Sequence, residues 1–480
     1  MKEYPSSKKN GLLAGPIVFF LILSFSGFIF NKEADTVIAV AAWMITWWIT
    51  EAVSISVTSL IPLTIFPILG IMDIKTVAAN YSSPIVYLFF GGFVIALALE
   101  KVNLHRRIAL SILKMTGTKA DGVIFGFMLS TWLMSMWISN TASTVVMLPI
   151  ALSVIGLLIN DADGFTKNDQ NFALSIMLGI AFAANIGGTA TLVGTPPNSV
   201  MLGILNENFS LDIGFFQWMK MGVPFALLML FVCYFFLVKV VYPNNLGTLK
   251  TSEAVIQEEL DKLGIMSKGE KVVSVVFVCT ALAWMLRGQI NTFFPDIKLT
   301  DTTISMLGAL SLFILPLDFK KGEFPLQWED TKKLPWGILI LFGGGLALAG
   351  GLKAAGLIDM LGQFISSKDG WSVLLIASVL TFVMLFMTEL MSNVALVTIL
   401  IPLVAAIAIG LDVPILHMVI PVTLASSCAF MLPMATPPNA IVFASGHIKV
   451  AEMAKVGIIL NVVSVLLLIA LFYFVVPLMF

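Results

Sequence analysis

The chain consists largely of long apolar runs joined by short polar segments, and this pattern restricts its fold more than any other feature. A helix needs about 20 apolar residues to cross the hydrocarbon core of a bilayer. Charged residues make up only 11% of the chain, compared with about 25% in ordinary globular proteins. We therefore predict an all-α polytopic membrane protein in contact with the lipid bilayer. The apolar runs lie near residues 11–30, 36–51, 53–72, 84–115, 121–158, 171–212, 217–242, 271–290, 301–317, 336–365, 371–408, 414–445 and 456–480.

The rest of the composition argues against several classes of protein. The net charge of -1 comes without the clustered basic face that a nucleic-acid partner requires. No glycine-rich nucleotide-binding motif is present, which argues against a primary pump, and we expect neither an enzyme nor an organic cofactor. Cys233, Cys279 and Cys428 lie inside apolar runs without metal-ligand spacing, so we expect them to pack as small apolar side chains.

Lysine and arginine gather on the cytoplasmic side of membrane proteins, and their positions predict the orientation of the chain. Lys2, Lys8 and Lys9 place the amino terminus inside, ahead of a retained first span. Runs 121–158 and 371–408 are interpreted as re-entrant hairpins, which gives about eleven transmembrane helices and puts the basic segments 105–119, 250–271 and 320–333 inside as well. Two full crossings in place of each hairpin would give the same sides. We expect a multi-pass protein of the plasma membrane, in bacteria the inner membrane.

An internal repeat divides the chain into two halves. Leu88-Phe89 with Gly91-Gly92 corresponds to Leu341-Phe342 with Gly344-Gly345, a shift of 253 (341 minus 88), and Ser139-Asn140 corresponds to Ser392-Asn393 at the same shift. A third pair, Thr-Pro-Pro-Asn at 195–198 and at 436–439, is shifted by 241. The predicted orientation makes the repeats inverted, a pattern typical of secondary transporters. The predicted parts are a first span at 1–35, a first repeat at 36–242 with the unwound helix 171–212, a cytoplasmic linker at 243–270, and a second repeat at 271–480 with the unwound helix 414–445.

The repeated motifs interrupt apolar runs with hydroxyl, amide and backbone groups. Non-helical backbone at membrane depth persists only where protein or a water-filled cavity satisfies it. The helix that follows each break presents free N–H groups, which favour an anion, and the helix that precedes it ends in carbonyls, which favour a small hard cation. A single Ser-Asn pair would more simply bond two packed helices. Two pairs at equivalent positions, each with a Thr-Pro-Pro-Asn loop, indicate a binding site.

Charge considerations predict that a cation accompanies an anionic substrate. No arginine or lysine stands beside either motif, so a bound carboxylate would need a cation to neutralise it. Glu389, three residues before Ser392, is ionisable within an apolar run and could carry a proton. The alternative, which we favour, is a structural carboxylate at the base of the hairpin, because the first repeat has Met136 at this position.

The paired Ser-Asn motifs with their Thr-Pro-Pro-Asn loops resemble the divalent anion:sodium symporter family, in particular its bacterial INDY-type dicarboxylate transporters. The segments Asn80 to Ser82, Ile138 to Leu148 and Ser426 to Gly446 are especially similar. The resemblance implies a homodimer in which a transport domain moves elevator-fashion against a scaffold. It implies two sodium sites, formed by Ser135, Ser139, Asn140 and the backbone near Gly188, and by Thr388, Asn393 and the backbone at Met391 and Ala435. The substrate carboxylates would contact Ser139, Asn140, Thr141, Ser392, Asn393, Val394 and the region of Pro437.

One departure from the family pattern concerns the substrate. Many bacterial members have Thr where this chain has Val394, and valine cannot donate a hydrogen bond. We predict a sodium-coupled importer of C4-dicarboxylates such as succinate, malate and fumarate. The alternatives are a sodium-independent dicarboxylate exchanger, a sodium/citrate or sodium/sulfate symporter, a proton-coupled carrier that uses Glu389, and an anion channel.

Overall fold

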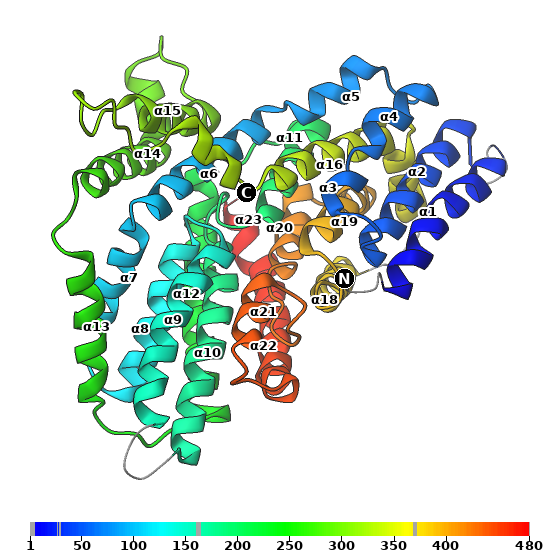
Figure 1. The fold of residues 1–480 in the computed structure, drawn as a ribbon. Coiled ribbons are helices and arrows are strands. Elements are labelled where there is room, and N and C mark those ends of the chain that lie inside the picture. Colours follow the sequence, from blue (N-terminus) through cyan, green and yellow to red (C-terminus); the bar gives the residue numbers. More distant parts are fainter. Residues whose placement is uncertain (1–4, 26, 28–29, 160–164, 368–371, 480) are drawn as a thin grey trace.

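The computed structural model describes residues 5–25, 27, 30–159, 165–367 and 372–479, and the regular elements in these ranges are helices (Figure 1). This confirms the predicted all-α fold class. The start of the predicted hairpin at residue 371 and the polar stretch around residue 160 lie outside the described residues.

The first half of the chain runs from α1 to the π-helix η1. Its elements are α1 (Ser6–Ser24), α2 (Lys32–Thr50), α3 (Ile55–Thr58), α4 (Ile61–Ile68), α5 (Ile74–Tyr81), α6 (Pro84–Lys101), α7 (Leu104–Met115), α8 (Ala120–Ser135), α9 (Asn140–Ile159), α10 (Lys167–Gly188), α11 (Pro196–Phe209), α12 (Phe215–Phe235) and η1 (Phe236–Val241).

The second half follows the linker helix α13 (Lys250–Leu263). Its elements are α14 (Lys268–Phe293), α15 (Asp301–Ile314), the 3-10 helix η2 (Trp328–Lys333), α16 (Trp336–Ala354), α17 (Leu357–Ser366), α18 (Val373–Thr388), α19 (Asn393–Gly410), α20 (Ile415–Ala425), α21 (Pro437–Ala444), α22 (Val450–Ala470), η3 (Leu471–Val475) and α23 (Val476–Met479).

Seven helical segments among the described residues are long and apolar enough to cross a membrane. Other apolar helices are shorter, and the four runs that carry the motifs are each split in two, giving the pairs α8 and α9, α10 and α11, α18 and α19, and α20 and α21. Of these half-helices, α10 and α19 are themselves among the seven long segments. The number of crossings and the re-entry of the two hairpins stay predictions.

Helix boundaries repeat with the same offset as the sequence motifs. The first residues of α7 and α17, of α8 and α18, and of α9 and α19 are each 253 positions apart (357 minus 104, 373 minus 120, 393 minus 140). Helices α11 and α21 both begin at the first proline of Thr-Pro-Pro-Asn, 241 positions apart, because proline is pre-organised for the first turn of a helix. The inverted relation of the two halves remains a prediction.

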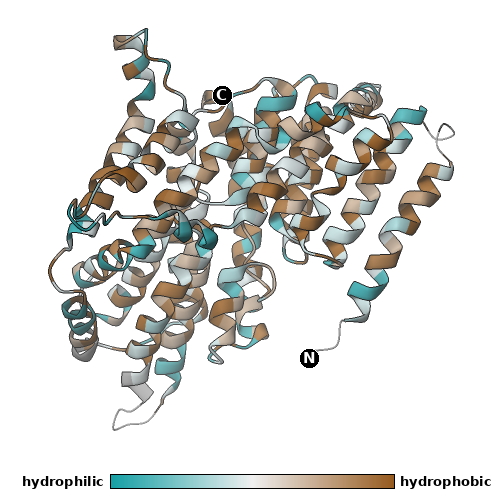
Figure 2. Ribbon diagram, turned by 45° about the horizontal axis from the view of Figure 1, so that its top comes forward, coloured by the Kyte–Doolittle hydropathy of each residue, from teal (hydrophilic) through white to brown (hydrophobic). Residues whose placement is uncertain are grey.

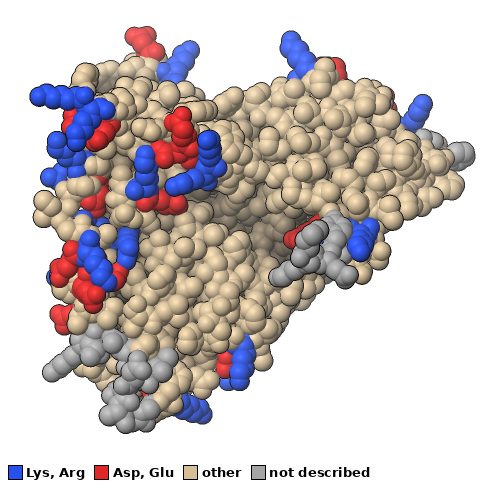
Figure 3. Space-filling view, viewed as in Figure 1, with Lys and Arg blue, Asp and Glu red and all other residues tan. Residues whose placement is uncertain are grey.

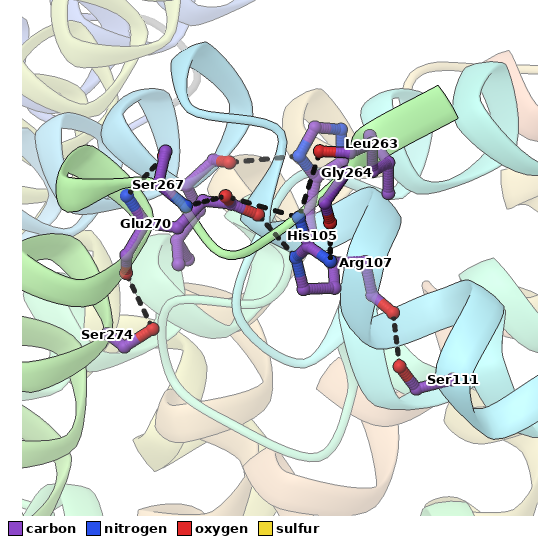
Figure 4. A network of polar contacts seen from close by, with 9 residues as sticks. His105, Arg107, Ser111, Leu263, Gly264, Ser267, Glu270 and Ser274 are labelled. Carbon is purple, nitrogen blue, oxygen red and sulfur yellow. Dashed lines mark hydrogen bonds and ion pairs between the residues drawn. The ribbon is translucent and has the colours of Figure 1, made fainter. Parts of the chain in front are cut away.

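The linker between the halves is more ordered than a plain connecting loop. Its helix α13 lies along α7 (Figure 1), and Arg106 forms an ion pair with Glu259. Arg107 contacts the Glu270 carboxylate at 2.6 Å and donates to the carbonyls of Leu263 and Gly264, so one side chain joins α7, the end of α13 and the first turn of α14 (Figure 4).

The surface of the molecule is suited to contact with lipid. Hydrophobic residues cover the long helices, and hydrophilic residues gather at helix ends and loops (Figure 2). Large apolar side chains on the long helices are well exposed, among them Phe235 at 55% and Leu466 at 62%. In the face drawn in Figure 3, charged side chains lie toward the margins and leave a broad uncharged area.

Candidate functional site

The first oxygen cluster lies where the hairpin α8–α9 turns. The Oγ of Ser135, the last residue of α8, lies 2.7 Å from Oδ1 of Asn140 and 2.7 Å from the carbonyl oxygen of Ala184 in α10. Gly188 packs directly on this amide, because a Cβ added there would lie 2.5 Å from the same Oδ1. A glycine is therefore required for the close approach of α10 to Asn140.

The second oxygen cluster has the same construction in the other half. The Oγ1 of Thr388, the last residue of α18, lies 2.6 Å from Oδ1 of Asn393 and 2.8 Å from the carbonyl oxygen of Ser426. Thr388 and Asn393 stand 253 positions after Ser135 and Asn140 (388 minus 135, 393 minus 140). Each half thus brings together a hydroxyl, an amide oxygen and a backbone carbonyl oxygen.

These clusters contain more hydrogen-bond acceptors than protons. A hydroxyl carries one proton, while amide and backbone carbonyl oxygens carry none. With the amide oxygens turned toward Ser135 and Thr388, each hydroxyl faces two acceptors within 2.8 Å and can donate to only one of them. The second oxygen–oxygen contact is repulsive, and a cation bound beside both oxygen atoms would offset that repulsion. Neutral and carbonyl oxygens are suitable ligands for a small hard cation.

The second helix of each hairpin begins with a serine cap. Ser139 Oγ accepts from the N–H of Ala142 at 3.2 Å, and Ser392 Oγ accepts from the N–H of Ala395 at 3.5 Å. Both serine protons stay available, and the first N–H groups of α9 and α19 have no partner within their helices. Hydroxyl protons and helix N-termini together favour an anion.

The broken helices α10–α11 and α20–α21 are held by the asparagines of the two Thr-Pro-Pro-Asn motifs. Asn198 Nδ2 donates to the carbonyl of Thr191 at 2.9 Å, and Asn439 Nδ2 donates to the carbonyl of Leu432 at 3.1 Å. These acceptors are also 241 positions apart (432 minus 191). The asparagines thus shape the unwound segments from within.

Asn185 joins the two halves. Its Nδ2 in α10 lies 3.0 Å from Thr436 Oγ1 and 3.2 Å from Asn439 Oδ1, both in the second half. The side chain is 1% exposed. Asn185 is not among the site residues predicted from the sequence, where its position between the Ser-Asn and Thr-Pro-Pro-Asn motifs is the signal that could have indicated it.

Glu389 occupies the structural position that we favoured from the sequence. Its Oε1 accepts from the N–H groups of Phe430 and Met431 and from Nδ2 of Asn461, and its Oε2 accepts from the N–H of Leu432, all within 3.0 Å. The carboxylate is 3% exposed. It therefore anchors the unwound segment of the second half to the hairpin, which is a structural function.

A cavity of about 1650 Å³ opens between the two hairpin turns, and Figure 3 shows the hollow at the centre of this face. The predicted site residues that line it are Ser139, Asn140, Thr141, Met391, Ser392, Asn393, Val394, Ala435 and Pro437. Ser135, Thr388 and Gly188 are buried directly behind them. The structure thus brings all predicted site residues together, with the substrate candidates and part of the cation candidates at the cavity wall and Ser135, Thr388 and Gly188 deeper.

The cavity also reaches charged residues at its mouth, namely Lys8, Glu51, Glu100 and Lys333. Lys8 pairs with Glu51 at 3.1 Å. Lys8, His105 and Lys333, which line the cavity, belong to segments that the sequence predicts on the cytoplasmic side.

The profile of the family described as "Sodium:sulfate symporter transmembrane region" matches residues 10–480. The chain belongs to this family. The predicted relation to the divalent anion:sodium symporters is confirmed, as is the prediction of a membrane symporter in place of an enzyme.

Two named relatives match nearly the whole chain. The "Sodium-dependent dicarboxylate transporter SdcS" of Staphylococcus saprophyticus is 38% identical over 483 residues, covering 99% of this chain and 93% of the relative. The protein of the same name from Staphylococcus aureus strain USA300 is 38% identical over 485 residues, covering 99% and 92%.

Among solved structures, that of Neisseria gonorrhoeae MtrF, described as illuminating a class of antimetabolite efflux pumps, has a similar fold. Its TM-score is 0.53, with 13% identity, and the match covers 98% of this chain and 95% of that one. At this level of identity the similarity supports the polytopic helical fold alone.

Proposed function

We propose that the protein imports C4-dicarboxylates such as succinate, malate and fumarate by symport with sodium ions. The observation that carries the proposal is the pair of equivalent oxygen clusters, around Ser135 and around Thr388, placed directly behind two capped helix starts in one cavity. Each cluster binds one sodium ion as co-transported substrate, and the two relatives named as sodium-dependent dicarboxylate transporters support this assignment.

The two hairpins bind the two ends of the dianion. One carboxylate contacts Ser139, Asn140 and Thr141 at the start of α9, and the other contacts Ser392 and Asn393 at the start of α19, beside Val394 and Pro437. Asn140 and Asn393 serve both ligands, with the amide oxygen toward sodium and the amide N–H toward the carboxylate. Sodium binding therefore orders the anion site and neutralises part of the substrate charge.

The transport motion that we propose is an elevator movement of both hairpins with both broken helices. The bonds that support a single moving unit are those from Ser135 to the Ala184 carbonyl, from Thr388 to the Ser426 carbonyl, and from Asn185 to the opposite half. The remaining helices would form the scaffold of a homodimer in the plasma membrane, with the amino terminus in the cytoplasm.

The test is uptake of labelled succinate into proteoliposomes, with an inward sodium gradient compared with an equimolar potassium gradient. We expect accumulation with sodium only. Equal uptake in both gradients, appearing only after preloading with dicarboxylate, would instead identify an exchanger and contradict the sodium sites. Unlabelled sulfate and citrate are added as competitors, because the family description names sulfate, and stronger competition by either than by malate would contradict the substrate class.

A further inference from the structure

Each backbone carbonyl of the two oxygen clusters is followed by a polar side chain that has no assigned role. Asn185 follows Ala184, and Ser427 follows Ser426, a shift of 242 (426 minus 184, 427 minus 185) that is one residue more than that of the Thr-Pro-Pro-Asn motifs. The two residues correspond because each follows the carbonyl that contacts the hydroxyl of its cluster. Asn185 and Ser427 are 1% and 3% exposed, and both line the central cavity. The two side chains thus occupy equivalent positions beside the two proposed sodium sites.

The hydrogen bonds of Asn185 fix which way its amide points. Its neighbour Asn439 uses Nδ2 to donate to the carbonyls of Ala429 and Leu432, so Asn439 turns its acceptor oxygen toward Asn185. Asn185 must therefore present its Nδ2 to that oxygen, and a further contact of this Nδ2 to the Ala429 carbonyl agrees with this orientation. Its Oδ1, which can only accept, is left without a protein partner.

Ser427 repeats this pattern with a hydroxyl. Its Oγ is buried and also has no hydrogen-bond partner in the protein. Most serines in these helices donate to a carbonyl of the preceding turn, as Ser426 does to Thr423. A buried oxygen without a hydrogen-bond partner is unfavourable on its own. Two such oxygens, each next to a proposed cation site in its own half, indicate that both bind the same kind of ligand.

We propose that Asn185 Oδ1 and Ser427 Oγ each supply one further oxygen to the neighbouring sodium site. Small hard cations favour about six oxygen ligands, and each cluster described above provides three. An amide oxygen can only accept a hydrogen bond, and an ionised substrate carboxylate has no proton to donate to it. A cation is therefore the better ligand for this oxygen. The inference rests on the proposed function, and it adds two ligands that distinguish the sites chemically, an amide oxygen in the first half and a hydroxyl in the second.

The test measures sodium binding without transport. The purified full-length protein is heated in detergent without substrate, at increasing sodium concentrations and constant ionic strength set with potassium, and the sodium concentration for half-maximal stabilisation is determined. Ser427→Ala should raise this concentration about threefold to tenfold, because one oxygen ligand is lost. Ser427→Thr keeps the hydroxyl and should restore the half-saturation to within about twofold. Ser153→Ala, at an exposed position of α9, is the matched control and should coincide with the wild type.

Asn185→Leu should also raise the sodium half-saturation, and it should lower the melting temperature without sodium, because its Nδ2 links the two halves. The two effects are scored separately. A lowered melting temperature with an unchanged half-saturation, in this variant or in Ser427→Ala, would mean a purely structural side chain and would overturn the proposal. If sodium stabilises the wild type no more than potassium does, the sodium sites of the proposed function are themselves wrong.

Discussion

The two halves of the molecule share one frame but anchor their unwound segments with different groups. In the first half, Thr191 Oγ1 of the segment donates to the Met136 carbonyl of the hairpin turn at 2.6 Å, and Trp218 Nε1 donates to the Thr189 carbonyl at 3.0 Å. In the second half, Glu389 of the hairpin accepts from three consecutive backbone N–H groups, at 430–432. The first segment is thus tied to its hairpin by one neutral hydroxyl, and the second by a carboxylate that binds its backbone.

The same comparison applies to the helices that cover the segments. Gly222 of α12 packs on the first segment, where an added Cβ would lie 2.8 Å from the Ala190 carbonyl, and Gly457 of α22 packs on the second, 2.3 Å from the Phe430 carbonyl. Both halves therefore need a glycine at the covering helix. The two halves therefore share their helix arrangement and these glycine contacts. They differ in the groups that anchor the unwound segments and in having Thr141 in one hairpin and Val394 in the other.

The largest effects should come from the residues that the halves share. Asn140→Ala and Asn393→Ala each remove a contact to both sodium and substrate, so each should reduce succinate uptake by more than about 100-fold, equivalent to about 3 kcal/mol. Uptake into proteoliposomes measures this, with the melting temperature as the check of folding. Near-normal sodium-dependent uptake by both folded variants would rule out these site assignments.

A change confined to the first half comes next. Gly188→Ala places a methyl group against Asn140 Oδ1 and should reduce uptake about 10-fold to 100-fold, since displacing the amide costs about 1 to 3 kcal/mol. The matched control is Gly288→Ala in α14, where an added Cβ meets no atom within 4 Å, and it should transport normally. Equal uptake by the two variants would mean that the close approach of α10 to Asn140 is unimportant.

Removing the anchor of the second segment should reduce uptake more than removing the anchor of the first. Glu389→Gln replaces one acceptor oxygen by a donor that faces backbone N–H groups, so we expect about 10-fold weaker uptake. Thr191→Val removes one neutral bond in the first half and should cost about threefold. The pH profile of uptake is measured for both variants. A loss of pH dependence confined to Glu389→Gln would show that this residue carries a proton, in contradiction to its anchoring function.

The smallest effect concerns the linker, which lies outside the repeats. The hydrogen bond from Lys262, together with Arg106, holds the pKa of Glu259 below its ordinary value of 4.5. Such a lowered pKa stabilises the folded state above pH 4.5, and this stabilisation is lost as the pH falls through the folded-state pKa. Glu259→Gln should therefore lower the stability by about 0.5 kcal/mol at pH 7, and thermal melting should show the difference from wild type vanishing below pH 4. A difference that persists there would mean that the pair does not act through charge.

The sequence predicted the features that repeat along the chain. The motif offset of 253 reappears in the starts of three pairs of helices, and each motif-bearing run breaks at its motif. These features are local, because proline, glycine and polar side chains within an apolar run disfavour a continuous helix. The site residues, which the family resemblance implied, line one cavity or are buried directly behind it.

The features that the sequence did not predict depend on contacts between distant residues. Glu389 binds backbone N–H groups about 41 to 43 positions away, and Asn185 binds side chains 251 and 254 positions away. The pattern of apolar and polar residues does not indicate which backbone groups of an unwound segment lack a helical partner. These contacts could therefore be identified only from the three-dimensional structure. The contacts of Arg106 and Arg107, which join α7 to α13, are also of this kind. A cluster of charged residues in the sequence does not indicate which opposite charges its members contact.

The most direct test of two sodium sites, one in each half, is the flux ratio of sodium to succinate in proteoliposomes loaded with the wild-type protein. Labelled sodium and labelled succinate are followed together during the first seconds of uptake, and empty liposomes give the leak. The account predicts that at least two sodium ions enter with each succinate. A ratio of one sodium ion or fewer per succinate would contradict it.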